Sequence, residues 1–347
     1  MGIVKLCHRR VEVALQESRY PMQAEDKQRL KELTAALPPG SGLRLTLNKH
    51  AQREAFQAFG RDLQALAPGI DLLTEVTGEA EPPCLETTSG IRFQALPEGD
   101  KLDSFVDALR PAAPHDGDLP ATQHDLLRRM RLPAEVRLYI APGCPFCPRA
   151  LAQWVALAKA GDLLRLRVVD CTLFPETVAE EKIKGVPTLI LDDQLRWSGT
   201  IPVTDVLEQL VNRDPRRLSA EAMNGIIQEG QAGQLARAML ESGSLFPGVV
   251  DLLTHDKWPV RLGAMVIMEE IVAANPLLAA EAAPVLRQRY GNLDDPVRGD
   301  VLYTIGATGD HRNVPFLENI SRTSANPEIH QAALEALASL RDRNATS

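Results

Sequence analysis

Two cysteines three positions apart, Cys144 and Cys147, are the residues of this chain best suited to chemistry. They lie between an apolar run at 136–140 and a helical pattern at 151–157, an order that predicts a strand, a tight turn and a helix. At the start of a helix, unpaired backbone N–H groups and the positive end of the helix dipole favour an anion. Such surroundings lower a cysteine pKa from about 8.5 into the range of roughly 3.5 to 7.5. The spacing therefore predicts thiol–disulfide exchange, with Cys144 as the nucleophile and Cys147 as the resolving thiol.

A second feature lies further along the chain, where Gly185, Val186 and Pro187 lead into an apolar strand at 188–191. Pro187 follows Cys147 by 40 residues, and one further predicted strand lies between them. This arrangement resembles the thioredoxin fold, in which a Val-Pro-Thr proline is cis and faces the cysteine pair. The resemblance implies that a cis bond at Pro187 leaves the backbone carbonyl and N–H groups of Val186 free to pair with an extended substrate segment.

Two other uses of the cysteine pair must be weighed. A zinc site needs about four ligands, often from a second C-x-x-C or from paired histidines. The chain has neither, because Cys171 is isolated and His8, His115 and His124 are scattered. A structural disulfide is typical of oxidising compartments, whereas a chain without a secretory signal meets reducing thiols. Redox-active cysteines are therefore the favoured interpretation.

The composition argues against several classes of function. The chain has 347 residues, a net charge of −8 and a pI near 5.5, so it has no cationic field to hold nucleic acid. No apolar run approaches the length of about 18 residues that a membrane span requires. The N-terminus is basic but lacks an apolar core of secretory length. We therefore expect a cytoplasmic protein that binds neither nucleic acid nor membranes.

The region before the cysteine pair has a similar predicted order. Residues 25–118 read as helix, strand, helix and strand, followed by two short strands and a closing helix. The turn after the first strand, at 48–51, holds no cysteine. This region is therefore predicted to be a thioredoxin-like order that cannot run the redox chemistry.

Residues 25–213 resemble the tandem thioredoxin-fold proteins, which include glutaredoxin-like protein disulfide oxidoreductases and the N-terminal domain of the alkyl hydroperoxide reductase flavoprotein. The run at 90–99 resembles the end of the first fold in that family, and the runs at 139–148 and 185–187 resemble its second fold. The resemblance implies one continuous sheet shared by two folds, with a cleft between them. It also suggests a peroxiredoxin as the protein that brings the disulfide. The residues expected to contact the substrate are Pro145, Phe146, Val186 and Pro187.

Two positions depart from the family pattern. Thioredoxins place a buried aspartate six residues before the first cysteine, where it helps to deprotonate the second, and this chain has Leu138 there. Related domains often carry an acidic residue just after the turn at 97–99, where this chain has Asp100 and then Lys101. Deprotonation of Cys147 is therefore assigned to water, the substrate or another group, such as a lysine before the Val-Pro-Thr turn.

The last part of the chain, 214–347, has apolar helical stripes and no predicted strand. Three similar segments place Val260, Val297 and Ile329 at spacings of 37 and 32 residues, which resembles HEAT-type helical repeats. Stacked arrays of this kind present extended surfaces that bind other proteins. The region has 12 Lys and Arg against 17 Asp and Glu, a net charge of −5 that opposes phosphate binding.

The sequence thus predicts an α/β part followed by an all-α part, in which two fused thioredoxin-like folds precede a short HEAT-like α-solenoid. The predicted regions are an N-terminal extension (1–24), a thioredoxin-like fold without C-x-x-C (25–118), a fold with the redox pair (119–213) and a helical repeat domain (214–347). The resemblance implies that Cys84 takes the place that Thr188 has in the second fold, and an inert buried thiol is its favoured interpretation. Cys7 and Cys171 receive no role.

The predicted activity is protein disulfide oxidoreduction, with the helical repeats recruiting a protein partner. No glycine fingerprint for a dinucleotide occurs, so no bound cofactor is expected and electrons would come from a separate reductase. Two alternatives stay open. One is a non-enzymatic adaptor that uses both kinds of module for docking, and the other is direct reduction of peroxide at Cys144.

Overall fold

The computed structural model describes residues 22–38, 41–78, 82–111, 119–192 and 195–344. The chain forms two compact units, 1–212 and 213–347. All but the last three positions of the predicted N-terminal extension lie outside the described residues, and so does Cys7.

Eight strands of the first unit form one sheet in the order β2-β1-β3-β4-β6-β5-β7-β8. Their bounds are β1 (Ser41–Leu47), β2 (Ile70–Val76), β3 (Cys84–Thr87), β4 (Ile91–Gln94), β5 (Ala134–Ile140), β6 (Leu164–Asp170), β7 (Thr188–Leu191) and β8 (Leu195–Ser198).

The sheet repeats one pattern twice. In the first half, β1 is parallel to β2 and antiparallel to β3, which is antiparallel to β4. In the second half, β5 is parallel to β6 and antiparallel to β7, which is antiparallel to β8. Parallel pairing of β4 with β6 joins the halves. The prediction of two fused thioredoxin-like folds is therefore confirmed, and they share one continuous sheet.

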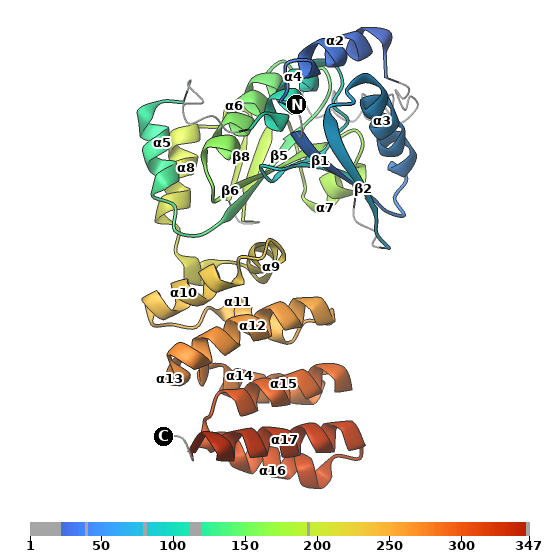
Figure 1. Cartoon of the computed structure of the whole chain (residues 1–347). Coiled ribbons are helices and arrows are strands. Elements are labelled where there is room, and N and C mark those ends of the chain that lie inside the picture. Colours follow the sequence, from blue (N-terminus) through green and yellow to red (C-terminus); the bar gives the residue numbers. More distant parts are fainter. Residues whose placement is uncertain (1–21, 39–40, 79–81, 112–118, 193–194, 345–347) are drawn as a thin grey trace. The chain divides into compact units, whose positions relative to one another are not determined.

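Helices cover one face of this sheet (Figure 1). The helices of the first unit are α2 (Ala24–Thr34), α3 (Arg53–Leu66), α4 (Leu102–Leu109), α5 (Ala121–Arg128), α6 (Cys147–Ala160), α7 (Pro175–Glu180) and α8 (Val203–Asn212), with a 3₁₀ turn η1 (Gly99–Lys101) before α4. β1 buries alternate residues, so its leucines point to one face. Phe59 of α3 and Phe93 of β4 pack edge-on against Phe105 of α4. α6 packs beside α4 and buries Trp154 completely, so one apolar core runs through both folds.

The opposite face of the sheet carries a row of paired charges. Arg44 of β1 and Arg92 of β4 both contact Glu86 of β3. Arg92 also reaches Glu135 of β5, which pairs with Arg167 of β6 at 3.0 Å. The row crosses from β4 to β6, so these side chains link the two folds in addition to the backbone ladder.

The second unit is helical in its described residues. Its helices are α9 (Ala220–Gln228), α10 (Ala232–Ser242), α11 (Pro247–Leu253), α12 (Trp258–Ala274), α13 (Pro276–Ala279), α14 (Ala282–Arg289), α15 (Asp295–Ala307), α16 (Val314–Thr323) and α17 (Pro327–Asn344). The three segments aligned in the sequence begin α12, α15 and α17, which stack in that order (Figure 1). The helical prediction is confirmed, and the assignment to HEAT-type repeats stays a prediction. None of the described helices is both long and apolar enough to cross a membrane.

Candidate redox site

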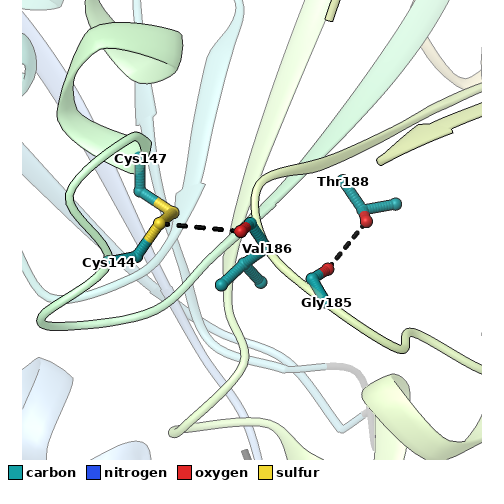
Figure 2. The surroundings of a disulfide bond; sticks show 5 residues. All are labelled: Cys144, Cys147, Gly185, Val186 and Thr188. Carbon is teal, nitrogen blue, oxygen red and sulfur yellow. Dashed lines mark hydrogen bonds between the residues drawn. A yellow bond between two sulfur atoms is a disulfide. The ribbon is translucent and has the colours of Figure 1, made fainter. Parts of the chain in front are cut away.

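The two cysteines meet at the carboxyl end of β5. Cys144 lies in the turn 141–146, and Cys147 is the first residue of α6. A disulfide joins them, with the two Cα atoms 5.5 Å apart (Figure 2). Cys144 is half-buried, whereas only 3% of Cys147 is exposed. An incoming substrate can therefore reach the sulfur of Cys144 more readily, which is the asymmetry that a nucleophile and a resolving thiol require.

The helix begins later than the sequence prediction placed it. We expected Cys144 at the helix start, but α6 starts three residues further on, at Cys147, with Pro148 in its first turn. Proline is well tolerated there because the first helical N–H groups have no partner within the helix. Gly143 has a φ of +74°, which glycine adopts without steric cost and which lets the chain reverse before the helix. The positive end of the helix dipole thus acts on Cys144 from just beyond the helix end.

The loop before β7 faces the disulfide. The Val186–Pro187 peptide bond is cis, as the resemblance implied. The carbonyl oxygen of Val186 lies 3.6 Å from Cys144 Sγ, and Figure 2 shows it directed at that sulfur. In the reduced protein, the Cys144 thiol can donate a weak hydrogen bond to this oxygen. Thr188 Oγ1 donates to the carbonyl oxygen of Gly185 at 2.7 Å, which holds the loop in place.

The two residues between the cysteines are open to solvent. Pro145 is exposed, and Phe146 exposes 69% of its surface. Pro187, by contrast, is buried. An exposed aromatic ring beside a reactive sulfur offers apolar contact area to a bound protein segment.

A buried ion pair that sequence reasoning missed lies at the same edge of the sheet. Asp170, the last residue of β6, pairs with Ile140 at the end of β5 and is 1% exposed. Its Oδ2 lies 2.9 Å from Nζ of Lys101, which belongs to the first fold. Its Oδ1 accepts hydrogen bonds from the backbone N–H and the hydroxyl of Thr172. The first fold thus supplies a cation next to the strand end that leads into the redox turn. The signal in the sequence was an aspartate ending an apolar strand, since a buried carboxylate needs a partner.

The corresponding turn of the first fold is used differently. When the first residues of α3 and α6 are aligned, His50 takes the position of Cys144. His50 Nε2 lies 2.9 Å from Glu176 Oε1, and its ring centroid is 5.3 Å from that of Phe174. Both partners belong to the second fold, so this turn forms part of the junction between the folds.

The remaining described thiols do not join the site. Burial raises the pKa of the Cys84 thiol to about 12, and two nearby arginines offset this only in part. Cys84 begins β3 as Thr188 begins β7. Cys171 directly follows β6 and is 6% exposed. No cluster of three His, Cys, Asp or Glu side chains able to hold a metal ion occurs in the described parts of the chain.

Comparison with known proteins bears on the second fold. A sequence model described as a thioredoxin domain matches residues 134–212, so this region is a thioredoxin domain. The alkyl hydroperoxide reductase AhpF of Pseudomonas aeruginosa is 24% identical over 155 residues, which are 43% of this chain and 30% of that protein. AhpF of Xanthomonas campestris is 22% identical over 249 residues, or 67% of this chain and 46% of that protein. The chain thus spans less than half the length of these relatives.

Two solved structures are also similar. AhpF of Enterococcus faecalis, as a C503A mutant, has a TM-score of 0.47 and 23% identity, covering 55% of this chain and 99% of that one. A protein disulfide oxidoreductase of Aeropyrum pernix has a TM-score of 0.47 and 15% identity, covering 57% and 95%. The resemblance to these two kinds of protein that the sequence indicated is therefore confirmed.

Proposed function

We propose that this chain is a thiol–disulfide oxidoreductase that acts on protein disulfides through Cys144 and Cys147. One observation carries the proposal: the two sulfurs are joined in a disulfide, and that of Cys144 faces the carbonyl oxygen of Val186 at 3.6 Å. A bond that must open and close needs one accessible sulfur and a neighbouring edge where a substrate can align. Both features are present at this turn.

The proposed reaction transfers two electrons from the dithiol to a substrate disulfide. The Cys144 thiolate attacks one substrate sulfur, so a mixed disulfide forms and the other substrate sulfur leaves as a thiolate. The Cys147 thiol then loses its proton and attacks the Cys144 sulfur. This second step releases the remaining substrate thiolate and forms the Cys144–Cys147 disulfide. A separate reductase returns two electrons and two protons to complete the cycle.

Substrate docking is assigned to the loop and the turn on either side of the disulfide. The backbone of Val186 would pair with an extended substrate segment in the manner of an added strand. Pro145 and Phe146 would contact apolar side chains of that segment, and Pro187 would shape the loop from below. We propose a peroxiredoxin as the substrate protein, as the family resemblance suggests, and we propose that the helical unit recruits the partner.

Reduction of insulin by dithiothreitol tests the activity, because precipitation of the released B chain is easily followed. The parent chain should accelerate precipitation, and Cys144→Ser should abolish the acceleration. Cys84→Ser is the matched control and should leave the rate unchanged, because that thiol is held in its neutral form by burial. Equal rates for the parent and for Cys144→Ser would favour a non-enzymatic adaptor instead.

Trapping identifies the partner. A Cys147→Ser variant cannot complete the second step, so the mixed disulfide between Cys144 and the substrate should accumulate. We expect a purified peroxiredoxin in its disulfide form to be captured on a non-reducing gel and released by dithiothreitol. Consumption of peroxide by the parent chain alone, without any protein substrate, would instead indicate direct reduction at Cys144.

A further inference from the structure

Large apolar side chains are exposed along one side of α12. Trp258, Leu262 and Val266 expose 55%, 41% and 40% of their surfaces. Residues four apart lie on the same side of a helix, so the three form a continuous row more than two turns long. A tryptophan at one end of such a row is the side chain most often found at the energetic centre of protein interfaces.

The row continues onto the two helices stacked beside α12. Tyr303 of α15 is 50% exposed, and Leu334 of α17 is 43% exposed. The Tyr303 hydroxyl donates to Glu269 Oε1 of α12 at 2.8 Å, which ties the two helices together at this surface. Gly299 lies one turn before Tyr303, and the space above it is open, so the backbone of another helix can approach closely there. We call Trp258, Leu262, Val266, Tyr303 and Leu334 the α12–α17 surface.

This surface rests on a well-ordered layer. Arg261 of α12 is 2% exposed and donates to Asp300 of α15 at 2.6 Å and to the carbonyl oxygens of His255 and Asp256 at 2.8 Å. Further along, the helices α15 and α17 are in close contact at Gly306, where no side chain separates them. A surface that is fixed before binding loses little conformational entropy when a partner docks.

The charges beside the α12–α17 surface are mainly acidic. Glu269 lies on the α15 side of α12, and the Glu270 carboxylate lies over Gly233 of α10 on the other side. Glu335 adjoins Leu334 and is exposed. The whole unit has a net charge of −5, from 12 Lys and Arg and 17 Asp and Glu in 214–347. An apolar row with acidic margins complements basic partners, and it disfavours a second copy of itself through like-charge repulsion.

We propose that the α12–α17 surface binds an amphipathic, basic helix of a partner protein. The apolar face of that helix would lie along Trp258, Leu262 and Val266, and its Lys or Arg residues would meet Glu269, Glu270 and Glu335. The inference rests on the part of the proposed function in which the helical unit recruits a partner, and it specifies the chemistry of the segment recognised.

Tryptophan emission of the full chain provides the test. Trp258 is the exposed tryptophan, whereas Trp154 is fully buried and Trp197 is partly buried. The probe is a peptide about five helical turns long, patterned with leucine on one side and lysine on the other. We expect a saturable blue shift of emission as Trp258 leaves water. A peptide with glutamate in place of lysine should bind at least tenfold more weakly, and so should a scrambled peptide of the same composition. Equal binding of all three peptides would overturn the proposal.

Charge reversal locates the binding surface. Glu270→Lys with Glu335→Lys should weaken binding of the lysine peptide at least tenfold. Glu221→Lys with Glu318→Lys is the matched control, since it makes the same change in net charge at exposed positions on α9 and α16, and it should leave binding unchanged. An equal loss for both double variants would mean general charge attraction and would contradict the proposal.

A second copy as the occupant is the remaining outcome. Sedimentation of the chain without peptide should show a species whose mass does not depend on Leu262. A dimer that Leu262→Asp dissociates would overturn the proposal in favour of self-association. Insulin reduction is measured in parallel. Its loss with peptide binding intact would refute the redox function alone, and intact reduction without peptide binding would refute this inference alone.

Discussion

The two thioredoxin-like folds place different residues at the same turn. In the second fold, the turn before α6 presents Cys144 half-exposed, and Phe146 beside it is 69% exposed. In the first fold, His50 occupies the position of Cys144, but its side chain is only 14% exposed and contacts Glu176 and Phe174. The same backbone plan is thus open for chemistry in one fold and closed as a contact between folds in the other. The difference between them is one of access as well as of side-chain type.

The strand next to each turn shows a second difference. Val76 ends β2 beside Leu47, and Asp170 ends β6 beside Ile140, so the two residues hold the same position in the repeat. Val76 is 64% exposed because β2 is the outer strand of the sheet, whereas Asp170 is 1% exposed. The first fold covers Asp170 and supplies its counter-charge from η1. The fold without cysteines therefore supports the redox fold.

The largest effect is expected from breaking that support. Lys101→Met should destabilise the first unit by about 3–5 kcal/mol, because it leaves the Asp170 carboxylate buried without its cation. Adding Asp170→Asn should restore much of the loss, since the amide oxygen can still accept the hydrogen bonds from Thr172 without a charge. Urea unfolding followed by circular dichroism measures both changes.

A second lysine of the junction is the matched control. Lys159 of α6 is as buried as Lys101, and its Nζ lies 3.2 Å from Asp107 of α4, whose side chain is 39% exposed. Lys159→Met leaves its partner in contact with water, so the loss of stability should be clearly smaller. Equal losses for the two variants would mean that the removal of lysine packing, and not the stranded carboxylate, sets the cost.

Acid should weaken the charged row that joins the folds. Burial opposes ionisation of Glu135, but Arg167 and then Arg92 outweigh it and lower the pKa of Glu135 below 4.5. A carboxyl group with a lowered pKa adds stability above its unfolded pKa, and this stability is lost as pH falls through the folded pKa. Glu135→Gln should therefore be less stable than the parent at neutral pH, and the difference should shrink below about pH 4.5.

The outer end of the row gives the control for this effect. Glu75 of β2 lies 3.6 Å from Arg44, and its side chain is 46% exposed. Glu75→Gln should change stability little at any pH, because an exposed pair contributes only about 0–1 kcal/mol. Unfolding midpoints measured from neutral pH down to about pH 3 would compare the two variants. A difference between Glu135→Gln and the parent that does not depend on pH would contradict the assigned role of the charge.

The sequence predicted the elements whose signals are local. Alternating apolar residues and turn residues predicted most of the strands, and the two cysteines with the later Val186 and Pro187 predicted which turn to examine. It did not predict that His50 contacts Glu176, 126 positions away, or that Lys101 contacts Asp170, 69 positions away. Neither pair leaves a periodic signal, because each forms only when two separate folds join edge to edge. The start of α6 was also misplaced, since proline is as acceptable in the first turn of a helix as in the turn before it.

A smaller effect is expected when the first-fold turn loses its contact. His50→Ala removes the bond to Glu176 and the ring contact with Phe174, and it should destabilise the first unit by about 1 kcal/mol. The loss is modest because Glu176 is 48% exposed and can turn to water. Lys49→Ala changes an exposed neighbour in the same turn and should have no measurable effect. If His50→Ala unfolds at the same urea concentration as the parent, the turn is not a structural contact between the folds.

The smallest effect is expected from giving the first fold its own cysteines. Aligned by their helix starts, His50 and Arg53 correspond to Cys144 and Cys147, so His50→Cys with Arg53→Cys grafts the C-x-x-C spacing onto the first turn. In a Cys144→Ser background, this variant should not regain insulin reduction. The sulfur at position 50 would face Phe174 and Glu176 of the second fold, where a protein disulfide cannot reach it. The turn also presents Gln52 where the redox turn presents its exposed phenylalanine. Mass analysis after alkylation should find the new cysteines intact, which separates a chemically present pair from an accessible one. Recovery of more than about a tenth of the parent rate, which corresponds to a barrier difference under about 1.4 kcal/mol, would mean that the missing cysteines alone distinguish the folds and that access does not.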